Sequence, residues 1–147
     1  MDTLCDLMLD ARAVAAVEAA LAEDVGTGDA TTLALVDPTV SATGEILARE
    51  ACRVAGVSVG KKVLELVDPR LAVEIVVPDG HDVEKGGTIL TIRGKAASIL
   101  VAERTALNFM QRMCGIATLT SRFVEAVKAY GTLILDTRKT TPNLRLF

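Results

Sequence analysis

The stretch from Leu133 to Pro142, LILDTRKTTP, constrains the fold more than any other part of the sequence. It begins with three apolar, strand-forming residues after Gly131 and then becomes polar. A short, continuous apolar run predicts a strand that is buried on both faces in a parallel sheet, because a half-exposed strand would alternate. In α/β folds, polar working groups lie just beyond the carboxyl ends of such strands. The adjacent cations Arg138 and Lys139, each beside a threonine, therefore predict an anion-binding site.

Composition limits the kind of protein that can carry this site. With 147 residues, 50% of them apolar, the chain can bury one good core and is near the size of a single domain. A net charge of −3, no Trp, one Tyr and three Phe argue against a nucleic-acid surface, which needs a basic stripe and usually stacking aromatics. No apolar run is long enough for a membrane helix, and no signal-peptide pattern opens the chain. We therefore expect a cytoplasmic protein.

The metal-binding and thiol residues follow no pattern typical of a site. The cysteines are Cys5, Cys52 and Cys114. Because they are odd in number, far apart and without CxxC spacing, they predict buried structural thiols rather than disulfides or a zinc site. Three carboxylates in residues 23–32, EDVGTGDATT, match no calcium loop, so this segment is predicted to be a structural turn. His81, the only histidine, is predicted to be a solvated loop residue.

Local patterns predict two helices in the first half of the chain. Residues 10–23 carry apolar side chains at three-and-four spacing, with Asp10 as the predicted N-cap. Residues 59–67 predict a second helix, which ends before Pro69 because proline disfavours helix at the preceding residue. Strands are predicted at residues 43–49, 71–77 and 88–92. Residues 78–94, which contain Val83, the Gly86-Gly87 turn and the strand at 88–92, are predicted to form a small antiparallel unit.

Residues 97–113 give the clearest helical pattern of the chain. One apolar stripe is formed by Ile99, Ala102, Ala106, Met110 and Met113. Arg104 falls on a neighbouring stripe, with Val101, Asn108 and Gln111, and so points away from the core. Cys114-Gly115 predicts a break, and residues 116–130 predict a second helix that turns Leu119, Phe123, Val124 and Val127 inward. A helix that leads into a buried strand at Leu133 is the start of a β/α alternation.

Three segments in matching order resemble quinolinate phosphoribosyltransferases, also called nicotinate-nucleotide pyrophosphorylases (carboxylating). They are LAEDVGTGDATT, AERTALNFMQRMCGIAT and ILDTRKTTPNLR, and the resemblance runs from about Val17 to Leu146. It implies an α+β fold, in which an N-terminal α/β sandwich domain with a dimer-forming helix (residues 1–112) precedes the first helix and strand of an incomplete β/α barrel (residues 113–147). It also implies a homodimer or a higher homo-oligomer, whose active sites lie at the barrel mouth and are each completed by the neighbouring subunit's sandwich domain.

The resemblance implies a reaction and its residues. The family makes nicotinate mononucleotide, CO₂ and pyrophosphate from quinolinate and phosphoribosyl pyrophosphate with Mg²⁺, in NAD biosynthesis. Arg104 would bind a substrate carboxylate in the partner subunit's site. Thr137, Arg138 and Lys139 would bind substrate, with Lys139 as the catalytic candidate near the reacting ring. Guanidinium groups suit a pyridine dicarboxylate because their planar forks bind carboxylates in a bidentate way. Mg²⁺ would come with phosphoribosyl pyrophosphate, with its protein ligands past the end of this chain, and no metal ligand is predicted within it.

The chain also departs from the family, whose members are roughly twice as long, as expected for a barrel added to a first domain. We therefore expect the 147-residue chain to be inactive by itself. Two other interpretations remain open at this stage. One is a non-catalytic module for dimerisation, or a carrier-like β unit with Lys85 in its turn, although Lys85 lacks the MKM or DKA context of such carriers. The other is a phosphoribosyltransferase-like paralogue linked to molybdenum transport.

Overall fold

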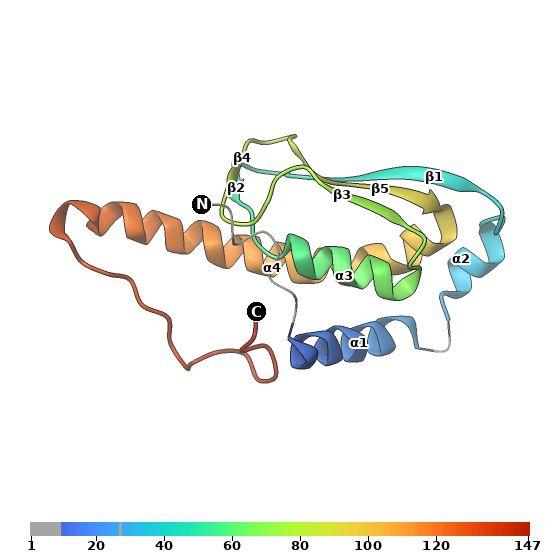
Figure 1. The fold of residues 1–147 in the computed structure, drawn as a ribbon, viewed down its shortest axis with the longest axis horizontal. Helices are drawn as coiled ribbons and strands as arrows, with labels where there is room; N and C mark the ends of the chain where they lie inside the picture. Colours follow the sequence, from blue (N-terminus) through green and yellow to red (C-terminus); the bar gives the residue numbers. More distant parts are fainter. Residues whose placement is uncertain (1–9, 27) are drawn as a thin grey trace.

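The computed structural model describes residues 10–26 and 28–147, and it has an α+β architecture. The elements are α1 (Ala11–Val25), α2 (Ala30–Leu35), β1 (Ser41–Leu47), β2 (Cys52–Arg53), α3 (Val57–Val67), β3 (Ala72–Ile75), β4 (Asp82–Val83), β5 (Thr88–Lys95), α4 (Ala96–Val127) and the 3₁₀ helix η1 (Lys128–Tyr130). In Figure 1 the strands form one layer, α3 and α4 lie beneath them, and α1 lies beneath these two helices. The predicted α+β class is confirmed.

The larger sheet has three strands in the order β1-β5-β3, and both pairings are antiparallel. Leu90 in the central strand stands opposite Ile46 on one side and Ile75 on the other. The predicted antiparallel unit of residues 78–94 is wrong in its pairing, because β5 pairs with β1 and β3 and not with the strand that contains Val83. A second sheet pairs β2 with β4, Cys52 standing opposite Val83. Every strand pairing in the described residues is antiparallel.

The core lies between the larger sheet and the helices. α1 begins as predicted, because the Asp10 side chain accepts a hydrogen bond from the Arg12 amide at 2.7 Å. The apolar stripe of α1 places Val17, which is fully buried, against α3 and α4. Gly60 allows these two helices to approach closely, since a Cβ there would lie 2.5 Å from Met110 Sδ. α1 and α4 are thus held on the same core, which fixes the position of side chains that contact each other across the two helices.

A buried carboxylate fastens the end of α3 to the start of α4. Asp68 is 4% exposed, and it accepts hydrogen bonds from Arg70 Nε at 2.8 Å and from Ser98 Oγ at 2.9 Å. The hydrogen bond from the Arg70 side chain is the main cause that holds the Asp68 pKa well below its usual range. The predicted end of α3 before Pro69 is also confirmed, because α3 ends at Val67.

The predicted break at Cys114-Gly115 is wrong, because α4 runs unbroken through both residues. A single glycine costs a helix only about 1 kcal/mol relative to alanine, and contacts from elsewhere in the chain hold this turn in place. Cys114 Sγ accepts a hydrogen bond from the Ala55 amide at 3.3 Å, and Thr118 Oγ1 accepts one from the Arg53 amide at 2.9 Å. α4 therefore crosses the predicted boundary between residues 112 and 113, and that division into domains stays a prediction.

The predicted strand at residues 133–135 is also wrong, because these residues have no regular secondary structure. Leu133 and Leu135 are 79% and 80% exposed, and a strand needs a neighbour for its backbone N–H and C=O groups. Neither sheet in the described residues supplies such a neighbour. The expected inward packing of Leu119, Phe123 and Val124 is wrong as well, since all three are exposed.

Candidate functional site

Arg104 lies on the exposed side of α4, as its stripe predicted, and it is paired with an acid from α1. Its Nε lies 2.8 Å from Asp24 Oδ1 and 3.0 Å from Asp24 Oδ2. The hydrogen bond to Asp24 is the main cause that raises the pKa of Arg104. Asp24 is the functional candidate that the sequence analysis missed, because it was assigned to a structural turn. A signal was present, since a carboxylate in the last turn of a helix opposes the helix dipole and needs a cation.

A groove of about 520 Å³ lies between α2 and α4 and contains Arg104. Its polar lining residues are Asp29, Thr31, Thr32, Glu103, Arg104, Asn108 and Gln111. The groove thus has one cation, Arg104, near the carboxylates of Asp29 and Glu103. The exposed guanidinium of Arg104 makes the groove a candidate place for a ligand carboxylate.

Asp29 shapes the α2 side of this groove. α2 begins within the predicted turn, residues 23–32. Asp29 is the N-cap of α2, accepting hydrogen bonds from the amides of Thr31 at 3.1 Å and Thr32 at 3.2 Å. The Thr32 hydroxyl also donates to Asp29 at 2.7 Å, and it is the main cause that lowers the pKa of this carboxyl group.

The other predicted site residues, Thr137, Arg138 and Lys139, are exposed in the segment after η1. The Lys139 amide donates to Thr137 Oγ1 at 3.3 Å, and Arg145 donates to the Arg138 carbonyl at 3.2 Å. No hydrogen bond or ion pair between described residues engages the side-chain nitrogens of Arg138 or Lys139. With respect to the residues that the structure describes, the two cations therefore present unengaged donors beside a threonine hydroxyl.

The segment is tied to α4 further along. Arg112 donates to Thr141 Oγ1, and the ring of Phe147 packs on Phe109 with centroids 5.1 Å apart. In Figure 1 the segment runs back from the far end of α4 toward α1. Residues 137–139 are not among those that line the groove of Arg104. Within one copy of the chain, the two groups of predicted site residues thus lie in separate places.

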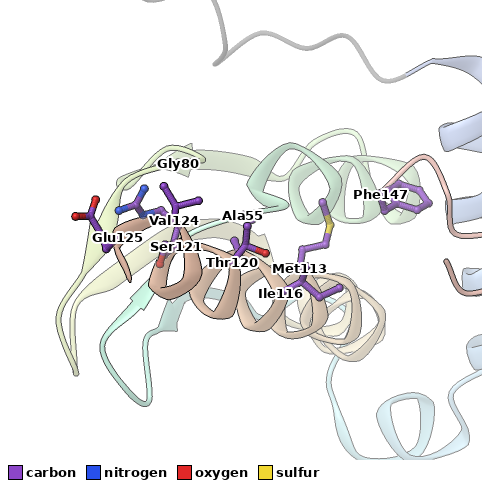
Figure 2. Close-up of a pocket in the computed structure, with 11 residues that line it drawn as sticks. Ala55, Gly80, Met113, Ile116, Thr120, Ser121, Val124, Glu125 and Phe147 are labelled. Carbon is purple, nitrogen blue, oxygen red and sulfur yellow. The ribbon is translucent and has the colours of Figure 1, made fainter. Parts of the chain in front are cut away.

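A second groove, of about 460 Å³, lies along the C-terminal half of α4 and is mainly apolar. Figure 2 shows Met113, Thr120 and Val124 on α4, with Ala55 and Gly80 on the loops beside it. Of the residues that the sequence pattern placed on the inward face of this part of α4, Val124 lines the groove, whereas Leu119 and Phe123 do not. The pattern assigned this face to the core, whereas Val124 is 42% exposed.

The metal-binding and thiol residues behave as ordinary structural groups in the part of the chain described. Cys114 is buried and Cys52 half-buried, both as free thiols, and burial is the main cause that raises the pKa of Cys114. Cys5 lies outside the described residues. His81 is exposed, as predicted. Among residues 10–26 and 28–147, no group of three or more His, Cys, Asp or Glu could hold a metal ion. None of the helices described there is long and apolar enough to cross a membrane.

Two family models match this chain, one after the other, from residue 29 to its last residue. The family model "Quinolinate phosphoribosyl transferase, N-terminal domain" matches residues 29–114, and the model of the C-terminal domain matches residues 116–147. The chain is 47% identical over 133 residues to nicotinate-nucleotide pyrophosphorylase (carboxylating), chloroplastic, of Arabidopsis thaliana, covering 90% of this chain and 38% of that protein. It is 44% identical over 131 residues to quinolinate phosphoribosyltransferase (decarboxylating) 1 of Nicotiana glauca, covering 88% and 37%.

Solved structures with similar folds carry the names of the same family. The nicotinate-nucleotide pyrophosphorylase of Francisella tularensis superposes with a TM-score of 0.87 at 35% identity, covering 92% of this chain and 48% of that one. NadC of Streptococcus pyogenes superposes with a TM-score of 0.85 at 41% identity, covering 89% and 47%. The chain thus spans a little over a third of the length of these curated relatives and a little under half of these solved chains.

An antiparallel sheet backed by α3 and α4, with exposed arginines on α4 and after it, defines an α+β protein that carries candidate anion-binding groups on its surface. The chain belongs to the quinolinate phosphoribosyl transferase family, because the family model of the N-terminal domain alone matches more than half of it. Lys85 falls inside that matched region, so the residues around it belong to this domain rather than to a carrier domain.

Proposed function

We propose that the protein containing this chain transfers the phosphoribosyl group of phosphoribosyl pyrophosphate to quinolinate and removes CO₂, giving nicotinate mononucleotide for NAD biosynthesis. The match of both family models, in order, over residues 29–147 carries this proposal. The names of the curated relatives above also favour quinolinate over a molybdenum-linked role. Because the chain spans about a third of their length, the activity is proposed for the whole protein.

Substrate recognition is proposed to use Arg104, Thr137, Arg138 and Lys139. Quinolinate carries two carboxylates, and the guanidinium edges of Arg104 and Arg138 that no described side chain engages can each bind one in a bidentate way. Thr137 adds a hydroxyl beside them. Because the Arg104 groove and residues 137–139 are separate within one copy, we propose that two copies of the chain form a homodimer with shared sites.

Lys139 is proposed as the catalytic residue, lying against the reacting ring and the phosphoribosyl group. The ring nitrogen of quinolinate bonds to C1′ of the ribose while the C1′–O bond to pyrophosphate breaks, through an oxocarbenium-like state. The bond from C2 to its carboxylate then breaks, and its electron pair stays at C2 until a proton replaces CO₂. A fixed ammonium group stabilises the negative charge that develops as pyrophosphate leaves.

Magnesium is proposed to enter with phosphoribosyl pyrophosphate. The residues described here do not form a metal site, since no cluster of three or more suitable ligands is present among them. When bound, Mg²⁺ supplies charge neutralisation for the pyrophosphate oxygens. The proposed cytoplasmic location rests on composition alone, and the Arabidopsis thaliana relative is named as chloroplastic.

The direct test measures nicotinate mononucleotide by mass spectrometry after incubation with quinolinate, phosphoribosyl pyrophosphate and Mg²⁺. The protein assayed is the chain continued through the remaining barrel sequence of the family, with the 147-residue chain alone for comparison. We expect product from the longer protein and a loss of at least about a hundredfold in kcat/KM for Arg138→Ala, since a substrate carboxylate would lose its bidentate partner. Arg122→Ala, another exposed arginine, on α4, is the matched control and should retain activity.

A mixing experiment tests the shared site. Arg104→Ala and Arg138→Ala proteins should each be inactive alone, and an equal mixture that exchanges subunits should recover about a quarter of the activity, because half the dimers then have one intact site. Absence of product from the wild-type longer protein would refute the proposed reaction. Product without recovery in the mixture would refute only the shared site.

A further inference from the structure

Arg104 is held by one edge of its guanidinium group and free at the other. Both carboxylate oxygens of Asp24 contact the single Nε, at 2.8 and 3.0 Å. A guanidinium has five N–H donors, and no described hydrogen bond engages the four on Nη1 and Nη2. The Arg104 side chain is 58% exposed, whereas that of Asp24 is only 22% exposed. The ion pair therefore orients the arginine without using its outer fork.

Asp24 occupies a place where a carboxylate is unfavourable for its own helix. It lies in the last turn of α1, and no residue of that turn is basic. The negative end of the helix dipole repels an anion there. Glu23 precedes it at the same helix end and is exposed. The interaction that stabilises Asp24 thus comes from α4, a helix far away in the sequence.

The position of the Asp24 side chain is fixed by contacts with the core. The Thr105 hydroxyl, 3% exposed, donates to Asp24 Oδ2 at 3.4 Å. α1 is docked on α3 and α4 through the fully buried Val17. Arg104 thus receives a fixed partner on a rigid element, which is the arrangement that pre-organises a binding group.

We infer that Asp24 is a positioning residue for Arg104, holding the Nε edge so that the Nη1–Nη2 edge is presented to a substrate carboxylate. The inference rests on the proposed function of Arg104. Two effects of Asp24 oppose each other, because its charge weakens the attraction of Arg104 for an anion while its geometry spares the ordering of a long, exposed side chain. Charge effects at this exposed site are screened by water, so the ordering effect should dominate.

The test measures kcat and KM for quinolinate in the longer protein used for the proposed function. Asp24→Ala should raise KM for quinolinate about tenfold, with kcat and KM for phosphoribosyl pyrophosphate within about twofold, since a misplaced binding group weakens ground-state binding. Asp24→Asn should fall between wild type and Asp24→Ala, because its amide oxygen can still accept from Nε. Glu23→Ala, the matched control, should leave KM unchanged.

A second measurement reads the ion pair directly and does not depend on activity. In ¹H–¹⁵N spectra, the Arg104 Nε–H of the wild-type chain should exchange slowly with water, and Asp24→Asn should retain part of that protection while Asp24→Ala loses it. Unchanged Nε–H exchange in Asp24→Ala, or an unchanged or lowered KM, would overturn the inference. If Arg104→Ala still impairs turnover in that case, the proposed function stands, whereas normal turnover in Arg104→Ala would overturn the role of Arg104 itself.

Discussion

Replacing Gly115 with alanine tests whether α4 runs unbroken, which is where sequence and structure disagree most. In the structure Gly115 lies inside α4, does not have a positive φ, and has no atom within 4 Å of an added Cβ. Alanine should therefore stabilise the helix. If the chain instead ended a helix at Cys114 and turned at Gly115, alanine would be strained in the left-handed conformation typical of that position.

The expected magnitude follows from helix propensity alone, because the new methyl group contacts nothing. Alanine is favoured over glycine in a helix interior by about 0.8–1.0 kcal/mol. Since Cys114 fastens this turn to the loop before α3 and Thr118 fastens it to β2, the gain should appear in global unfolding. For a domain of this size the melting temperature should rise by roughly 3 °C.

The assay is urea unfolding followed by circular dichroism at 222 nm, in wild type, Gly115→Ala and Gly86→Ala. Gly86 is the matched control, because its Cβ would also meet no atom within 4 Å but its φ is +85°. Alanine at Gly86 should destabilise the fold by about 1–2 kcal/mol, the cost of a left-handed conformation. A loss of stability in Gly115→Ala similar to that in Gly86→Ala would refute the continuous helix.

Three further predictions concern the core, acid stability and thiol chemistry. Leu64→Ala should lower the free energy of unfolding by about 2–5 kcal/mol in urea titrations, because Leu64 is 1% exposed. Leu33→Ala, 78% exposed, should change it by less than about 0.5 kcal/mol. Because the pKa of Asp68 is lowered in the fold, its contribution is present above its unfolded pKa of about 3.9 and is lost as pH falls below that value. The urea midpoint should thus fall less between pH 6 and 3 in Asp68→Asn than in wild type, and an equal fall would contradict this role. Since burial raises the pKa of Cys114, peptide mass spectrometry should find it alkylated by iodoacetamide more slowly than Cys52 at pH 8; faster labelling would contradict the buried position.

The sequence by itself determined those features that depend on neighbours along the chain. Asp10 caps α1 and Pro69 closes α3, since both act on the backbone of adjacent residues. The stripe on α4 that begins at Ile99 is buried and Arg104 is exposed, because helical periodicity alone separates the two faces. The motifs around Arg104 and Arg138 were also sufficient to identify the family that the comparisons confirm.

Only the tertiary structure decided whether those local signals were obeyed. A glycine such as Gly115 commonly marks the end of a helix. Here the helix continues through it, because the amides of Ala55 and Arg53 bond to side chains of the same part of α4. The apolar run at residues 133–135 remains exposed, because a strand exists only when another strand satisfies its backbone groups. Asp24 and Arg104 are 80 residues apart, so no local pattern could have paired them. Periodicity specifies which side chains share a face, whereas only the packing of distant segments specifies what that face meets.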